Sequence, residues 1–262
     1  MRGLRTKRLG SACSSPDERR TLAGMNLTRR SLLRAGLAVS LGGALSSGPA
    51  AAAGAGAESP LVIRPRSDWG ADLPATSELE SEDVRFLLVH HTASANDYGP
   101  DQVVGKLRAY FGYHTSPDKG WPDLAYNFMV DRFGGVWEGR TGSLAGPVRA
   151  SATGGSQGFA QLACFIGDFT ASAPTPEARF SMVALLAMLA DRYAVDTRPG
   201  AQVSFTSRGS NRWPAGADVT TSTIAGHRDM SMTACPGDVL YDDVVNRFPT
   251  DVTALRSPAP SC

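Results

Sequence analysis

Two residue types that bind metal ions are scarce in this 262-residue sequence and have unusual neighbours. Its four histidines lie at positions 90, 91, 114 and 227, and Cys235 follows His227 by eight residues. That spacing is too long for one helix face and suits a loop that folds back. Because Zn²⁺ accepts imidazole nitrogen and thiolate sulfur, one of the paired histidines with His227 and Cys235 would supply three ligands and leave a fourth position open. Ordinary core and turn positions are the alternative explanation.

The paired histidines follow a short apolar run. Residues 84–89 are mostly apolar and are bounded by polar residues, which is typical of a strand covered on both faces. His90 and His91 then lie at the carboxyl end of this strand, the usual edge for a site in such sheets. Since successive strand side chains point to opposite faces, at most one of the two can enter a given metal site.

Helical and strand patterns alternate along the rest of the chain. A helix opening at Gly99-Pro100-Asp101 has an apolar stripe that reaches His114, and residues 126–130 and 136–138 predict a hairpin. A buried strand over 162–166 precedes a helix that starts at Thr175-Pro176-Glu177 and runs to about position 193. Residues 199–223 predict a long excursion with weak strand character at 203–205, and a last helix covers 239–248. This order predicts an α/β fold: a mixed central β-sheet flanked by helices, in a single domain.

The first 57 residues predict an export leader and linker rather than part of the fold. Paired arginines, Arg29 and Arg30, precede an apolar stretch and then small residues, which indicates a secretory signal of the twin-arginine type. The apolar stretch is too short and too interrupted for a stable membrane span. Met25, just before the arginines, is a candidate for the true start. Residues 58–262 then form the functional domain.

Charge separates the same two parts. Residues 1–57 hold nine Lys or Arg and two Asp or Glu, whereas acidic residues outnumber basic ones in residues 58–262. An acidic domain with few lysines repels nucleic acid, so a nucleic-acid partner is not expected.

Three cysteines follow the leader, at positions 164, 235 and 262. An odd number in an exported protein leaves at least one thiol free, reactive or metal-bound. Cys164 lies in an apolar run and has two explanations, a small buried hydrophobe or a disulfide with Cys262.

Five segments in fixed order resemble one family: 88–93, 120–128, 135–140, 226–229 and 233–237. They read Leu-Val-His-His-Thr-Ala, Gly-Trp-Pro-Asp-Leu-Ala-Tyr-Asn-Phe, Gly-Val-Trp-Glu-Gly-Arg, Gly-His-Arg-Asp and Thr-Ala-Cys-Pro-Gly. The chain is similar over roughly residues 64–248 to the peptidoglycan recognition protein and type 2 N-acetylmuramoyl-L-alanine amidase family. Where many members have Ala-His and a later Asn before the buried strand, residues 148–155 here differ, so part of the groove wall is altered.

The resemblance implies a zinc-dependent enzyme that hydrolyses the amide between N-acetylmuramic acid and L-alanine in bacterial peptidoglycan, at the cell wall or outside the cell. It implies that His90, His227 and Cys235 hold Zn²⁺. Tyr126 matches the tyrosine beside the metal-bound water, and Thr233 falls where members have Lys or Thr; both are assigned catalytic roles.

Substrate-binding positions follow from the same resemblance. His114 matches a groove histidine and Trp121 a position that accompanies a diaminopimelate-type stem peptide. Arg140 has two explanations, an ion pair with a substrate carboxylate or one with Glu138. Asp229 has two as well, orienting His227 or capping the turn.

Two other functions compete with the amidase. A non-catalytic peptidoglycan-binding module would use the same groove without turnover, but family members of that kind tend to lack the cysteine or the tyrosine. A zinc peptidase that cuts inside the stem peptide would share the ligands, but the sequence has no His-Glu-x-x-His pair.

Overall fold

A six-stranded mixed sheet forms the centre of the protein in the computed structural model, which describes residues 61–154 and 158–257. The strand order is β1-β4-β3-β5-β2-β8. All neighbouring pairs in it are parallel except the β3/β4 hairpin. The strands are β1 (Ile63–Arg64), β2 (Phe86–His91), β3 (Phe128–Val130), β4 (Val136–Glu138), β5 (Ala160–Phe165) and β8 (Ile224–Gly226). The predicted mixed sheet is confirmed.

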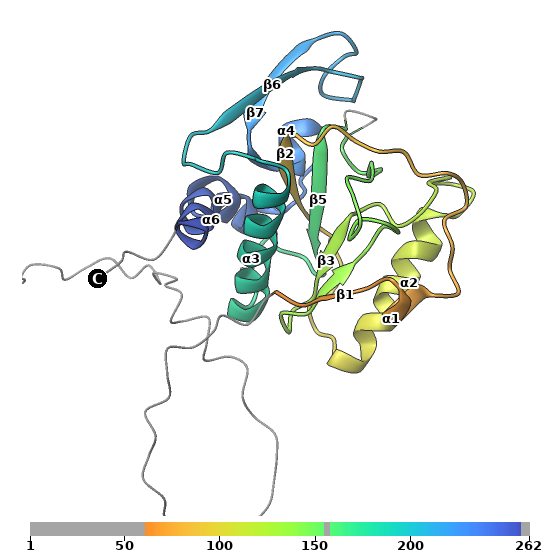
Figure 1. Ribbon diagram of the computed structural model, residues 1–262. Coiled ribbons are helices and arrows are strands. Elements are labelled where there is room, and N and C mark those ends of the chain that lie inside the picture. The colour runs from red at the N-terminus through yellow and green to blue at the C-terminus, as the bar shows by residue number, and fades with distance from the viewer. Residues whose placement is uncertain (1–60, 155–157, 258–262) are drawn as a thin grey trace, which may run out of the picture.

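Helices cover both faces of this sheet (Figure 1). The helices α3 (Pro176–Arg192), α5 (Asp238–Asn246) and α6 (Phe248–Arg256) lie on one face. On the other lie α1 (Ser67–Gly70) and α2 (Val103–His114), with the one-turn helix η2 (Pro100–Gln102) leading into α2. The remaining elements are the short helix α4 (His227–Met230) and a separate two-stranded sheet, β6 (Gln202–Thr206) and β7 (Asp218–Ser222).

The strand β2 is buried along its whole length. Its side chains alternate between two cores: Leu87 and Val89 pack with the α3 side, whereas Phe86 and Leu88 pack on the opposite face. This alternation is what the pleat of a strand requires. It also sends the two histidines that end the strand to opposite faces of the sheet.

The predicted hairpin, buried strand and long helix are all present. The helix α3 begins where the sequence indicated: Thr175 is its N-cap and accepts a hydrogen bond from the Ala178 N–H at 3.2 Å, and Pro176 stands at its first position. Nine of its residues are buried, which explains why it reads as largely apolar.

Several short elements were not predicted. They are β1, α1, β7, β8, α4 and α6. The expected last helix over 239–248 ends at Asn246, and a further helix starts at Phe248 with Pro249 in its first turn. Proline is compatible with a first turn because that N–H has no partner within the helix. The chain therefore breaks and resumes as a helix where one continuous helix was expected.

The leader prediction over residues 1–57, the start at Met25 and the thiol of Cys262 lie outside the described residues. Within them, no helix is both long and apolar enough to cross a bilayer. Cys164 is fully buried in β5. Because Cys262 lies outside the described residues, the pairing of these two cysteines stays a prediction.

Candidate active site

Three side chains distant in sequence meet at one edge of the sheet. His90 lies at the carboxyl end of β2, and His227 begins α4 directly after β8. Because β2 and β8 are parallel neighbours, their carboxyl ends share this edge. Cys235 returns to it by the loop after α4, and the Arg228 N–H donates to the Cys235 carbonyl at 3.0 Å to close that loop. The fold therefore brings the three predicted ligands together.

The donor atoms of the three side chains lie within 4.8 Å of one another. Cys235 Sγ is 3.7 Å from His90 Nδ1, and the ring centroids of His90 and His227 are 4.4 Å apart. Zinc bonds of roughly 2.0–2.3 Å at a tetrahedral angle would place a nitrogen and a sulfur ligand about 3.6 Å apart. The residues present thus fit a zinc ion.

Burial also sets the protonation of these groups. Desolvation lowers the pKa of His227 to about 4 and that of His90 well below its usual value, and the neighbouring imidazoles add to both shifts. Both rings are therefore neutral at pH 7 and offer lone pairs to a cation. Burial raises the pKa of the Cys235 thiol to about 12, against opposing effects from the His91 N–H and Arg228. A cation bound at the site would favour its thiolate form.

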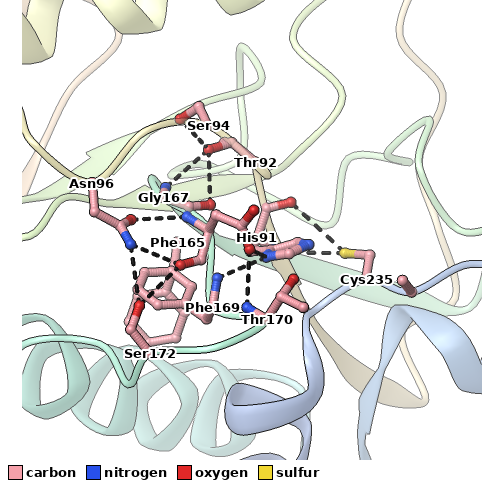
Figure 2. A network of polar contacts seen from close by, with 12 residues as sticks. His91, Thr92, Ser94, Asn96, Phe165, Gly167, Phe169, Thr170, Ser172 and Cys235 are labelled. Atoms are coloured by element: carbon pink, nitrogen blue, oxygen red, sulfur yellow. Dashed lines mark hydrogen bonds and ion pairs between the residues drawn. The ribbon is translucent and has the colours of Figure 1, made fainter.

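The His91 side chain points away from this cluster and contacts the backbone next to it. Its ring Nδ1 accepts a hydrogen bond from the Phe169 N–H at 3.2 Å, and its own backbone N–H lies 3.5 Å from Cys235 Sγ (Figure 2). Figure 2 also shows the Cys235 sulfur aimed at the His91 backbone. Of the two adjacent histidines, the structure places His90 among the three candidate ligands and His91 outside them.

Aromatic rings extend from the cluster along one side. The distances between neighbouring ring centroids are 5.0 Å from His90 to Tyr126, 5.6 Å from Tyr126 to His114 and 5.1 Å from His114 to Trp121. His114 is buried, and its Nδ1 accepts a hydrogen bond from the Ala125 N–H at 3.1 Å. Since burial lowers the His114 pKa to about 4, the neutral ring has its proton on Nε2. Three predicted site residues therefore form one continuous wall.

Thr233 is exposed on the loop that precedes Cys235, and its hydroxyl accepts a hydrogen bond from the Cys235 N–H at 3.2 Å. Asp229 caps the turn: one oxygen accepts from the Gly226 N–H at 2.9 Å, and the other accepts from the Tyr241 hydroxyl at 2.6 Å. Of its two suggested roles, the structure favours capping.

Arg140 is only 2% exposed. Its guanidinium donates to the carbonyls of Leu124 and Arg149 and to the Ser151 hydroxyl. Glu138 instead accepts from other backbone N–H groups, so the suggested Arg140–Glu138 pair is wrong. Buried among these acceptors, Arg140 fixes the segment that leads to Tyr126, and this placement does not support a direct contact with a substrate carboxylate.

Sequence reasoning missed an ion pair beneath this wall. Arg66 donates to Asp123 at 2.7 Å, and Asp123 also accepts from the N–H groups of Leu124 and Thr141. The only signal in the sequence was Asp123 within the Gly120 to Phe128 segment, and its partner lies 57 residues earlier.

Donors of the kind that hold zinc, gathered at the strand ends of a mixed α/β sheet, define a candidate metal-dependent hydrolase. The family model described as Amidase_2, N-acetylmuramoyl-L-alanine amidase, matches residues 80–238. The chain belongs to this family.

Curated relatives agree with this assignment. Peptidoglycan recognition protein 1 of Mus musculus is 30% identical over 187 residues, covering 68% of this chain and 84% of the relative. The N-acetylmuramoyl-L-alanine amidase of Homo sapiens is 30% identical over 204 residues, 76% of this chain but 30% of that protein.

Solved structures share the fold. Drosophila peptidoglycan recognition protein SD superposes with a TM-score of 0.56 at 21% identity, covering 71% of this chain and 94% of that one. A human homologue in complex with a glycosamyl muramyl pentapeptide superposes with a TM-score of 0.53 at 23% identity, covering 71% and 95%.

Proposed function

We propose that this chain is a zinc-dependent N-acetylmuramoyl-L-alanine amidase that hydrolyses the bond between N-acetylmuramic acid and the first L-alanine of the peptidoglycan stem. The observation that carries the proposal is the convergence of His90, His227 and Cys235, with Tyr126 beside them. Family members that only bind peptidoglycan tend to lack the cysteine or the tyrosine, and this chain has both.

His90, His227 and Cys235 would hold the metal. Bound there, Zn²⁺ would supply Lewis acidity at the scissile carbonyl and lower the pKa of a water towards about 7. The residues around the ion would have the other roles in catalysis and substrate binding.

Tyr126 would act on the oxygen of the scissile carbonyl. Burial keeps the pKa of its phenol well above the ordinary value of 10, so the hydroxyl retains its proton at neutral pH. A fixed donor at this place stabilises the negative charge that develops on the oxygen when water adds to the carbonyl carbon, before the bond to nitrogen breaks. Thr233 would assist by fixing the backbone of Cys235, because its hydroxyl accepts a hydrogen bond from the Cys235 N–H. His114, with a proton on Nε2, and Trp121 would bind the substrate along the same wall.

We also propose that the domain acts outside the cytoplasm, on the cell wall, after export by the twin-arginine route. The support is the paired arginines and apolar stretch in the leader.

Digestion of purified cell wall by the zinc-loaded protein tests the activity. Release of intact stem peptides with a free amino-terminal L-alanine is the expected result. Cuts inside the stem would indicate a peptidase instead, and binding to the wall without release would indicate a recognition module.

Two variants test the assigned roles. Cys235→Ala should lose zinc and activity together, whereas the buried Cys164→Ala variant, outside the cluster, should keep zinc. Tyr126→Phe should keep zinc and lose most of the turnover, because only the donor is removed; Tyr110→Phe, another partly buried tyrosine, is its control. A fully active Tyr126→Phe enzyme would remove the tyrosine from the mechanism. Zinc content is measured by elemental analysis in each case.

A further inference from the structure

The long excursion between α3 and β8 forms a separate hairpin, β6 and β7 (Figure 1). Its Phe205 packs against Phe86 of the central sheet. The five residues of β6 pair antiparallel with the five of β7, and the tip covers residues 207–217. The tip lies against α4 and the loop that follows it, the segment that joins His227 to Cys235. The hairpin thus ends at the candidate active site.

Two hydrogen-bonded anchors fix the tip to that loop. Trp213 Nε1 donates to the Asp229 carbonyl at 2.9 Å. The side-chain oxygen of Asn211 accepts from the Met232 N–H at 2.9 Å and from the Ser231 hydroxyl at 2.8 Å. Arg212 lies between the two anchors in sequence, so its backbone position is set from both sides.

Arg212 forms one side of a hollow of about 450 Å³. Its lining includes Arg212, Arg228, Met232, Thr233, Asp238 and Tyr241. Thr233 connects the hollow to the candidate ligands, because its hydroxyl accepts from the Cys235 N–H. The rings of Tyr126, His114 and Trp121 extend from the His90 side of the cluster. Both the aromatic wall and this hollow therefore adjoin the cluster.

The charges in the hollow balance. Arg228 pairs with Asp238 at 2.9 Å and lies over the Tyr241 ring at 4.6 Å, and Asp229 accepts from the Tyr241 hydroxyl. Arg212 is exposed and forms no ion pair within residues 61–154 and 158–257. Two basic and two acidic side chains leave no net charge to select an anion. Donors and acceptors side by side suit the hydroxyl and acetamido groups of a neutral sugar.

An apolar surface completes the hollow. Met232 is 67% exposed, so its side chain is open to a ligand. A thioether at this place offers a polarisable contact to the carbon face of a sugar ring or to an acetamido methyl. The hollow thus presents both the polar and the apolar groups that a sugar requires.

We propose that the tip of the β6–β7 hairpin, through Arg212 and Met232, forms a subsite for the glycan strand of peptidoglycan. The inference rests on the proposed amidase function, which requires the bond to be cut to lie between a sugar and a peptide. The family resemblance matches His114 and Trp121 to positions for the stem peptide, and the hollow is left for the sugar.

Binding measurements test the subsite separately from hydrolysis. Two probes are titrated into the zinc-loaded protein by calorimetry. One is glycan strands of N-acetylglucosamine and N-acetylmuramic acid with their stems removed and the freed lactyl carboxyl groups converted to amides, so that the strands are neutral; the other is the free stem peptide. Arg212→Ala should weaken glycan binding about tenfold, the loss of one hydrogen bond to a charged donor, and leave peptide binding unchanged. Arg198→Ala is the matched control, because that arginine is 79% exposed and does not line the hollow. Met232→Ser should weaken glycan binding as well.

The outcomes separate the two proposals. If the protein does not release stem peptides but needs Arg212 to bind the glycan, the amidase proposal fails and the subsite stands. If it releases stem peptides and glycan binding is absent or is the same in Arg212→Ala, the subsite is refuted. Loss of peptide binding alone in Arg212→Ala would assign the hollow to a stem carboxylate and would also overturn the inference.

Discussion

The ion pair beneath the aromatic wall allows a quantitative test of what holds the site in place. Arg66 and Asp123 are both buried, and their closest atoms are 2.7 Å apart. The same guanidinium donates to the carbonyls of Gly139 and Leu73. Replacing Arg66 with Met keeps much of the packing volume and removes the charge, so Asp123 is left buried with only its backbone donors.

Breaking a buried ion pair from one side costs about 3–5 kcal/mol, because the remaining charge is uncompensated. A domain of this size has about 5–15 kcal/mol of stability in total, so the Arg66→Met variant should remain folded but lose a large share of it. At about 2–4 °C per kcal/mol, the melting temperature should fall by roughly 6–20 °C. Urea unfolding followed by circular dichroism gives the free energy, and calorimetry gives the melting temperature.

An exposed ion pair in the same molecule is the control. Arg108 contacts Asp72 through two hydrogen bonds of 2.7 Å, as short as the buried one, but both side chains are substantially solvated. Arg108→Met should leave the unfolding free energy close to that of the wild type, since water screens such pairs. The double variant Arg66→Met with Asp123→Asn should be more stable than the sum of the single losses predicts. An Arg66→Met variant no less stable than Arg108→Met would refute the reasoning.

Three further predictions concern the same framework. Burial lowers the pKa of His114 from 6.5 to about 4, so the unfolded chain binds a proton that the folded chain does not, and stability should fall as pH drops from 6.5 towards 4. His114→Asn, which keeps an acceptor for the Ala125 N–H, should flatten that slope in urea unfolding at several pH values. Thr175→Ala should cost about 1 kcal/mol by loss of the α3 cap, whereas Thr175→Ser should recover most of it. Gly237→Ala should cost roughly 3 kcal/mol, because φ is 92° and a Cβ would lie 2.4 Å from the Phe169 backbone; thermal melting checks both.

The parts of the fold that the sequence predicted have strong local signals. A run of buried apolar residues marked β2, and proline after a threonine cap marked the start of α3. The strand β8 had no such signal: it has three residues, one of them Gly226, and takes its extended form from pairing with β2. Its strand state is a property of the assembled sheet, which no window of sequence contains.

The site divides in a similar way. The alternation of a strand was enough to predict that only one of the two adjacent histidines enters the site, and the family resemblance was needed to choose His90. The environment of Arg140 was not predictable, because its acceptors are carbonyls, which every residue has, and only the folded chain decides which ones are near. Arg212 was missed for a related reason: it lies at a hairpin tip whose anchors on the Cys235 loop are side-chain contacts between segments apart in sequence.

The order of the strands has a consequence for when this protein can first act. His90 lies in the second strand of the chain, whereas Cys235, 145 positions later, reaches it only after β8 has joined the sheet. A polypeptide still emerging from the ribosome, or one cut short before its last thirty or so residues, has no place where these donors meet. The candidate metal site is therefore absent from any incomplete chain that lacks Cys235, and its donors meet only beside the paired strands β2 and β8.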